Sequence, residues 1–286
     1  ADSRTLVALQ EETAKNLWVS LDGDPKSAQA ITPLRRNVRD QGAVWTPDGS
    51  ILVGSNAGGD NRAWLMKADG SGQKALTDIG EFDGGLKVSP DGRFIFFFSM
   101  RSKTRQIWRK DIDGSNPKQL TDAGGVDSFS LTPDGASVIY ALYTPGIWKI
   151  SVDGGTPTKL SDVVAFGLDL SPDGKFVAFV SPDDKMKRLR LVVETFDKFE
   201  PVSTFDLPVT AENGHWAPDG RAFVYVETLG SISNLWRLPL DGSPARQISD
   251  FKSEYIPSFS YSGDGSKLVL SRGSTNRDAV LITDEK

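Results

Sequence analysis

The chain of 286 residues carries 33 Lys and Arg against 38 Asp and Glu, so its formal net charge is −5, which argues against a nucleic-acid partner. It has no cysteine, which excludes disulfides, zinc–thiolate sites and cysteine nucleophiles, and its single histidine cannot form a multi-histidine zinc site. No apolar run is long enough to span a bilayer, so we expect no direct membrane insertion.

The chain begins with three segments that we predict to be strands, namely Thr5–Leu9, Asn16–Leu21 and Gln29–Thr32. Five complete units of about 43 residues follow, and each has four short strands that we call A, B, C and D in chain order. The last piece supplies strands A, B and C, at Pro257–Ser262, Lys267–Ser271 and Ala279–Thr283. Together with 28 Gly and 16 Pro residues, this pattern predicts an all-β fold.

A turn signal joins strand A to strand B in every unit. Pro fixes φ at the first turn position, Asp accepts hydrogen bonds from nearby amides, and Gly takes the position with positive φ. The six copies are Thr46–Gly49, Ser89–Gly92, Thr132–Gly135, Ser171–Gly174, Ala217–Gly220 and Ser262–Gly265, the last with Gly in place of Pro. An Asp-Gly pair joins strand C to strand D in most units, as at Asp113-Gly114.

The seven tryptophans occupy two positions of the repeat. Five lie in strand C, namely Trp18, Trp64, Trp108, Trp148 and Trp236. The other two, Trp45 and Trp216, directly precede the turn. Large aromatic side chains at fixed positions of a repeat are typical of packing between sheets, so we interpret them as core residues rather than as a ligand cage.

Four-stranded units with this period are typical of a β-propeller. The predicted strands number 26, two fewer than seven complete blades need and two more than six. Because the two terminal pieces together hold six strands, we predict seven blades with incomplete seam blades, and six blades are the alternative. Residues 1–5 align with the turn of a repeat. We therefore expect residues 1–286 to form a single propeller domain that is the C-terminal part of a longer protein.

The stretch Ser89-Pro90-Asp91-Gly92-Arg93, an apolar strand and then IWRKDIDGSNPKQLTD at 107–122 resemble the WD-like repeat of TolB-type propellers. The resemblance extends over residues 1–286. The segments 249–253, 270–274 and 279–284 are similar to the C-terminal propellers of bacterial signalling proteins of the serine/threonine kinase or winged-helix regulator type. This resemblance implies a sensor or interaction domain in the periplasm or elsewhere outside the cytoplasm, with a cytoplasmic location left open.

The innermost strands of a propeller line its central channel, so strand A holds candidate binding residues. The residue two positions before the turn varies from unit to unit, as Val44, Lys87, Ser130, Asp169, His215 and Ser260. We predict that Lys87, Ser130, Asp169 and His215 form a polar channel site for a small ligand or ion. The alternative is a solvated channel wall with ordinary ion pairing. Four positions before the turn every residue is small or short, as expected where the blades converge: Gly42, Gly85, Ser128, Gly167, Asn213 and Ser258.

The two rims of the propeller differ in sequence. The A–B and C–D turns of one rim are nearly uniform, whereas the B–C and D–A connections of the other rim diverge, and divergent loops on a rigid scaffold commonly carry recognition. Two of these loops are basic, with Arg101, Lys103 and Arg105 in one and Lys185 and Arg188 in the other. We predict that they bind an acidic partner, and the alternative is a solvated charged loop.

Enzyme motifs are missing from the sequence. It has neither a Gly-x-Ser-x-Gly elbow nor a phosphate-binding Gly-x-x-x-x-Gly-Lys loop. Residues 111–122 faintly resemble a calcium loop, but the glycine is misplaced and strands flank the segment. We therefore predict a protein that is not an enzyme and that has no cofactor and no metal site.

The function predicted from these observations is binding. We expect a sensor propeller that binds a protein, peptide or small ligand at the channel mouth or the variable rim, within a larger signalling protein. The alternative is a gating or accessory propeller of a hydrolase such as an oligopeptidase. A structural module that assembles through its open seam is a third possibility.

Overall fold

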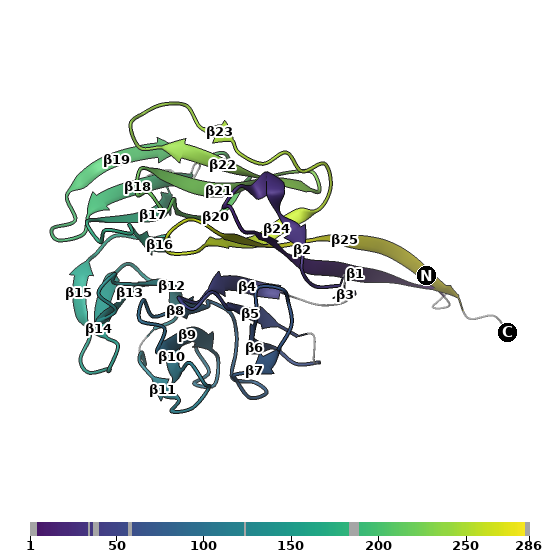
Figure 1. Ribbon diagram of the computed structural model, residues 1–286, viewed down its shortest axis with the longest axis horizontal. Helices are drawn as coiled ribbons and strands as arrows, with labels where there is room; N and C mark the ends of the chain where they lie inside the picture. Colours follow the sequence, from purple (N-terminus) through teal and green to yellow (C-terminus); the bar gives the residue numbers. More distant parts are fainter. Residues whose placement is uncertain are drawn as a thin grey trace.

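The structure is a computed structural model that describes residues 5–33, 35–36, 40–56, 59–122, 124–182 and 189–283. Six antiparallel sheets surround a central axis as the blades of a propeller, and each sheet contributes four strands to the ring (Figure 1). Among the described residues, the helical structure is limited to the 3₁₀ turn η1 (Pro25–Ser27).

Five blades each use four consecutive strands, of which the first is innermost (Figure 1). Blade 1 contains β4 (Asp40–Trp45), β5 (Ile51–Ser55), β6 (Arg62–Met66) and β7 (Lys74–Ala75). Blade 2 contains β8 (Lys87–Val88), β9 (Phe94–Ser99), β10 (Gln106–Asp111) and β11 (Lys118–Gln119). Blade 3 contains β12 (Val126–Leu131), β13 (Ser137–Leu142), β14 (Ile147–Ser151) and β15 (Thr158–Ser161).

The next two blades follow the same order. Blade 4 contains β16 (Phe166–Leu170), β17 (Phe176–Pro182), β18 (Leu189–Thr195) and β19 (Pro201–Asp206). Blade 5 contains β20 (Ala211–Trp216), β21 (Ala222–Leu229), β22 (Ile232–Pro239) and β23 (Arg246–Gln247).

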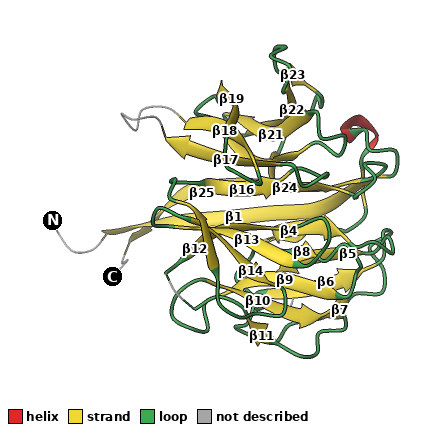
Figure 2. Cartoon of the chain, turned by 90° about the vertical axis from the view of Figure 1, so that its left-hand side faces the viewer, coloured by secondary structure: helices red, strands yellow, loops and turns green. Residues whose placement is uncertain are grey.

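Blade 6 is built from both ends of the chain. Its strands, from the axis outwards, are β24 (Tyr255–Tyr261), β25 (Leu268–Thr283), β1 (Thr5–Ser20) and β2 (Gln29–Ala30), and β3 (Arg35–Arg36) also pairs with β1. β1 and β25 are antiparallel along all 16 residues of each strand. The two strands run side by side and extend beyond the ring as a ribbon (Figures 1 and 2).

The prediction of seven blades with incomplete seam blades is wrong, because the structure has six. The sequence interpretation divided each terminal piece by a connection, at 11–15 and 273–277, whereas the structure has one continuous strand in each place. These two strands pair with each other. Two incomplete blades would leave strand edges with unpaired N–H and C=O groups, and the β1–β25 ladder pairs them instead.

The predicted A–B turns are confirmed. In blade 2 the Gly92 amide donates to the Ser89 carbonyl at 2.8 Å, and the Arg93 amide donates to Asp91 Oδ1 at 3.0 Å. The final glycine of the turn has φ between +66° and +85° in all six copies. Each unit therefore folds back at the position where only glycine avoids backbone strain.

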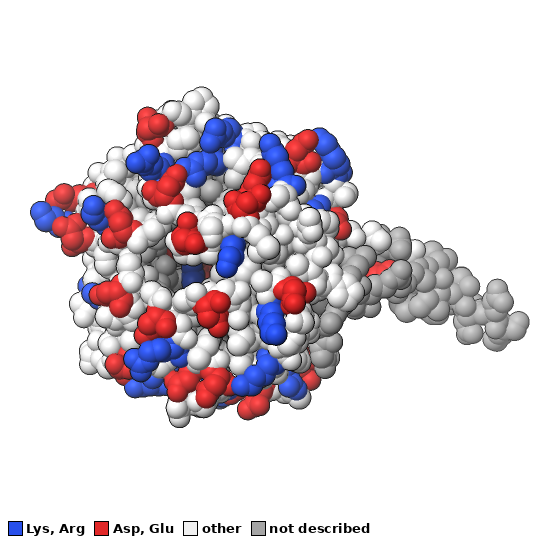
Figure 3. Space-filling model, in the orientation of Figure 1, with Lys and Arg blue, Asp and Glu red and all other residues white. Residues whose placement is uncertain are grey.

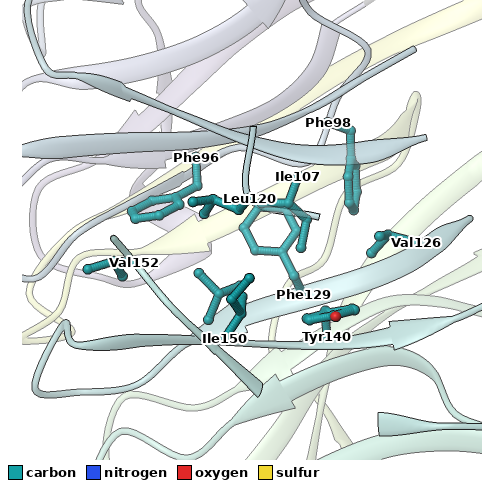
Figure 4. Packing of buried hydrophobic residues seen from close by; sticks show 10 residues of the cluster. Phe96, Phe98, Ile107, Leu120, Val126, Phe129, Tyr140, Ile150 and Val152 are labelled. Carbon is teal, nitrogen blue, oxygen red and sulfur yellow. The ribbon is translucent and has the colours of Figure 1, made fainter. Parts of the chain in front are cut away.

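The core consists of six clusters, and each one lies at the joint between two neighbouring blades. Figure 4 shows the cluster between blades 2 and 3, in which Phe96, Phe98 and Ile107 pack against Phe129 and Tyr140. The cluster that joins blade 6 to blade 1 contains Val19 and Val269 together with residues of β4, β5 and β6. Hydrophobic packing thus continues around the whole ring without a gap.

The tryptophans take part in these joints, as predicted. Trp45 and Trp216 are buried, with exposures of 7% and 5%. The five tryptophans of strand C are partly buried and pack against a core cluster, namely Trp18, Trp64, Trp108, Trp148 and Trp236. Burial of their large rings between sheets stabilises the stacking of blades.

Candidate functional site in the central channel

A cavity of about 760 Å³ occupies one end of the central channel. Its lining comes from the innermost strands of all six blades and the residues directly before them, from β17 and β21, and from Phe98, Arg105 and Leu207 near the ends of other strands. Because Asp83, Arg105 and Leu207 belong to the B–C and D–A connections, the cavity opens on the rim that carries them. Figure 3 shows one face of the ring hollowed at its centre, with acidic side chains around the opening and basic atoms inside it.

Four channel residues that the sequence singled out come together at one carboxylate. Asp169 Oδ1 lies 3.3 Å from Lys87 Nζ and accepts a hydrogen bond from Ser130 Oγ at 2.9 Å. His215 Nδ1 lies 3.5 Å from Asp169 Oδ2. These side chains belong to the innermost strands of blades 2, 3, 4 and 5, so the cluster connects four blades across the axis.

Backbone groups complete this cluster. The Trp216 amide donates to Asp169 Oδ2 at 3.2 Å, and the Trp216 indole N–H donates to the Asp169 carbonyl at the same distance. The Leu170 amide donates to Ser130 Oγ at 3.3 Å. Backbone N–H groups on the inner edges of β16 and β20 therefore donate to side-chain oxygens of the preceding blade, so they are not left unpaired.

The charge of Asp169 is stabilised in place. Burial by itself raises the pKa of a carboxyl group, but here the Lys87 ammonium, His215 and the Ser130 hydroxyl outweigh it and hold the pKa of Asp169 below its ordinary value. The carboxylate therefore remains ionised at neutral pH.

Lys87 and His215 line the cavity, whereas Asp169 and Ser130 do not. The Lys87 and His215 side chains are 28% and 40% exposed, and that of Asp169 is 12% exposed. The site therefore has two layers. A lysine and an imidazole face the cavity, and a buried carboxylate behind them fixes their positions.

The remaining wall is largely apolar and closely approached by backbone. The aromatic residues of the lining are Trp45, Phe98, Phe129, Phe166, Phe223, Tyr225 and Phe259. The small residues predicted where blades converge also line the cavity: Gly42, Gly85, Ser128, Gly167, Asn213 and Ser258. A Cβ on Gly85 would lie 2.2 Å from the Phe98 ring, so glycine is required at this close approach.

Sequence reasoning missed the acidic residues of the cavity lining. Asp127 and Glu212 lie five positions before the turn and Asp83 lies six before, and all three line the cavity. Their position at or just before the start of strand A could have identified these three residues in the sequence, because side chains there reach the mouth of the channel. Arg105 lies near them as a cation of the lining.

Of the basic rim residues predicted to bind a partner, two arginines contact other side chains of the propeller. Arg101 forms an ion pair with Glu81 Oε1 at 2.6 Å and stacks on the Trp108 ring. Arg105 donates a hydrogen bond to the Tyr143 hydroxyl at 2.9 Å and stacks on the Phe98 ring. Lys103 is exposed. Lys185 and Arg188 lie outside the described residues. Arg101 and Arg105 thus both make intramolecular contacts, and binding by these loops stays a prediction.

The described part of the chain contains no group of three or more His, Asp or Glu side chains arranged to hold a metal ion. Within the same residues, no helix has the length and hydropathy that a membrane span requires.

Fold and channel together define a six-bladed β-propeller with a cavity of ligand size at one end of its axis. A comparison with protein-family models matches residues 2–169 to the TolB beta propeller domain. Because this match covers more than half of the chain, the protein belongs to the TolB β-propeller family. A sequence search of curated proteins found no match.

Solved structures share the fold at low sequence identity. A protein classed as TolB from Agrobacterium tumefaciens is 17% identical, with a TM-score of 0.72 over 91% of this chain and 98% of that one. TolB from Acinetobacter baumannii is 18% identical, with a TM-score of 0.65 over 95% of this chain and 67% of that one. An oligogalacturonate lyase from Vibrio parahaemolyticus is 15% identical, with a TM-score of 0.56 over 92% and 78%.

Proposed function

We propose that this propeller is a non-catalytic recognition domain that binds a partner protein at the cavity end of its channel. It acts as the sensor or interaction part of a larger signalling protein, and it works outside the cytoplasm. Membership of the TolB β-propeller family supports a binding role. The signalling context and the location come from the resemblance of the last repeats to receptor propellers.

The position of the cavity carries this proposal. It opens on the rim where connections differ from blade to blade, while the opposite rim repeats one turn six times. Concave surfaces with a few polar groups on an apolar wall are typical binding sites, and variable loops on rigid strands commonly determine specificity. The acidic side chains of the lining favour a partner segment that carries basic residues.

The channel cluster favours binding over catalysis. Asp169 is surrounded by donors that keep it ionised, and it is separated from the cavity by Lys87 and His215. A general base needs direct access to the proton that it takes. Asp169 therefore acts in this proposal as a structural anion.

The test begins with the isolated protein as bait in an extract of the organism that encodes it, with the bound proteins identified by mass spectrometry. The purified candidate is then titrated calorimetrically. We expect Glu212→Arg, at the cavity, to weaken binding by about tenfold or more. The matched control is Glu200→Arg, an exposed residue of the C–D connection on the opposite rim.

Equal weakening by both variants, or by the control alone, would place the interface on the wrong rim and contradict the proposal. Turnover of a substrate by the purified domain would contradict the proposal that the domain is not catalytic.

A further inference from the structure

In the cavity, a lysine and a histidine side chain both contact the carboxylate of Asp169. Lys87 and His215 come from blades 2 and 5, and each is held at Asp169, through Oδ1 at 3.3 Å and Oδ2 at 3.5 Å respectively. An ammonium group carries three donors and no acceptor. Since the described contact with Asp169 uses one direction of the Lys87 ammonium, its exposed side remains for a ligand acceptor.

His215 is oriented in the same way. Its Nδ1 faces Asp169, and its ring meets the Phe259 ring edge-to-face at a centroid distance of 5.3 Å. Because Nδ1 is engaged with a carboxylate, the opposite nitrogen, Nε2, is left for the cavity, and it donates a hydrogen bond to a ligand carboxylate when the ring carries both protons. The charged groups that face this imidazole or share its cavity are Asp169 of β16, Lys87 of β8, Asp127 of β12, Glu212 of its own strand, and Asp83 and Arg105 in connections.

The rest of the cavity suits an apolar body. Aromatic rings from all six blades line it, and its volume of about 760 Å³ falls within the range of small-molecule sites. A ligand that satisfies both parts of the site has one compact acceptor group and an apolar or aromatic remainder.

We propose that this cavity binds a small organic carboxylate, with the carboxylate between Lys87 and His215 and the apolar body against Phe98, Phe129 and Phe259. This inference concerns a ligand class that the proposed partner-protein function does not require. Its failure would leave the partner experiment unaffected.

At Lys87 and His215 the local charge selects a carboxylate, whereas the acidic Asp127 and Glu212 lie nearer the channel mouth, where the proposed partner protein binds. Lys87 offers only donors, so an amine or guanidinium has no acceptor from it. A dianionic phosphate would carry twice the charge into a cavity that is lined by Asp83, Asp127 and Glu212 and backed by Asp169. A monoanion gains the contact with Lys87 at lower repulsion.

The single histidine makes the test direct, because the imidazole resonances in an NMR spectrum need no assignment. Phenylacetate is titrated into the labelled protein, and its uncharged isostere phenylacetamide is titrated in parallel. We expect a saturable shift of the His215 ring signals with phenylacetate, since the bound carboxylate and the phenyl ring both lie beside the imidazole. The amide should bind about tenfold more weakly or not at all.

Two variants locate the site by calorimetry. Lys87→Met and His215→Phe should each weaken phenylacetate binding by about tenfold, since each removes a charge-assisted hydrogen bond. Lys252→Met, at an exposed lysine outside the cavity lining, is the matched control and should bind as the parent does. Circular dichroism verifies that each variant is folded.

Equal binding of acid and amide, no saturable histidine shift, or unchanged binding by both folded cavity variants would overturn the proposal. If removal of Lys87 or His215 prevents folding, the comparison of acid and amide on the parent protein decides alone.

Discussion

Two buried carboxyl groups of blade 4 have opposite surroundings. Asp169 has Lys87, Ser130 and the Trp216 amide as partners, and these keep its pKa below the ordinary value despite burial. Glu194 is 8% exposed, and within the described residues its Oε2 has no hydrogen-bond partner. Burial raises the pKa of Glu194 because nothing compensates the desolvation of its charge. Asp169 therefore stabilises the fold, whereas the buried carboxyl group of Glu194 destabilises it.

Asp169→Asn should lower the free energy of unfolding by about 2–4 kcal/mol at neutral pH, because Lys87 loses its buried partner. The pKa of Asp169 is held below its ordinary value of 3.8, so its contribution is complete above that value and is lost as the pH falls from there through the lowered pKa of the folded state. Urea denaturation at neutral pH and at about pH 2 measures the effect. A stability difference that does not shrink in acid would contradict this account of the cluster.

Glu194→Leu should raise the free energy of unfolding by about 1–2 kcal/mol at neutral pH, since it removes a buried carboxyl oxygen without a partner. Apolar residues take the same position of strand C in three other blades, namely Met66, Ile150 and Leu238. The pKa of Glu194 is raised from 4.5, so the wild-type protein loses stability as the pH rises above that value. The increase in the free energy of unfolding caused by Glu194→Leu should therefore be larger at pH 7 than at pH 4.

Thermal or urea unfolding at both pH values tests this prediction. Glu200→Leu, at an exposed position of the same blade, is the control and should change stability little. A gain at Glu194 that is independent of pH would show that packing alone is responsible.

At the scale of the strand, the inner strands differ in how closely neighbouring side chains approach them. Gly42 and Gly85 occupy equivalent positions, and both have positive φ, of +112° and +66°. A Cβ on Gly42 would meet open space, whereas one on Gly85 would lie 2.2 Å from the Phe98 ring. Positive φ therefore favours glycine at both positions, but only at Gly85 would an added Cβ also clash with a neighbouring side chain.

Gly85→Ala should cost about 2 kcal/mol more stability than Gly42→Ala, because both variants carry the strain of positive φ but only the first displaces Phe98 from its core cluster. Urea denaturation of the two variants gives the difference. Equal losses would mean that Phe98 moves aside at no cost.

At the scale of the whole molecule, the ring is closed by strands from opposite ends of the chain. Val19 lies directly opposite Val269, and both are buried in the cluster that joins blade 6 to blade 1. This joint brings together segments about 250 residues apart in sequence and so carries a large loop-closure entropy.

Val19→Cys combined with Val269→Cys should form a disulfide on oxidation, since the native chain has no cysteine to compete. The bond should raise the free energy of unfolding by about 3–5 kcal/mol because it closes a very long loop. Mass spectrometry detects the bond and denaturation measures the gain, with the reduced protein as reference. Failure of the folded variant to cross-link would contradict the six-bladed closure.

The architecture of one blade could be predicted from the amino-acid sequence alone. Turn tetrads, Asp-Gly pairs and tryptophan positions are local signals, because a turn depends on its own four residues and strand packing repeats every 43 residues or so. The same periodicity located the channel residues, so the repeat alone identifies Lys87, Ser130, Asp169 and His215 as neighbours of the axis. Their convergence on Asp169 could not be predicted, since the distance between blades depends on how many of them share the axis.

The number of blades, in contrast, could not be predicted from local sequence signals. The terminal pieces, 5–20 and 268–283, have the composition of two strands each, and a short connection within them is locally as acceptable as a continuous strand. The choice depends on pairing between residues at opposite ends of the chain, where the ladder of β1 and β25 satisfies edges that separate hairpins would leave open. Local signals carry no information about such a partner, which is why six blades emerged from the fold alone.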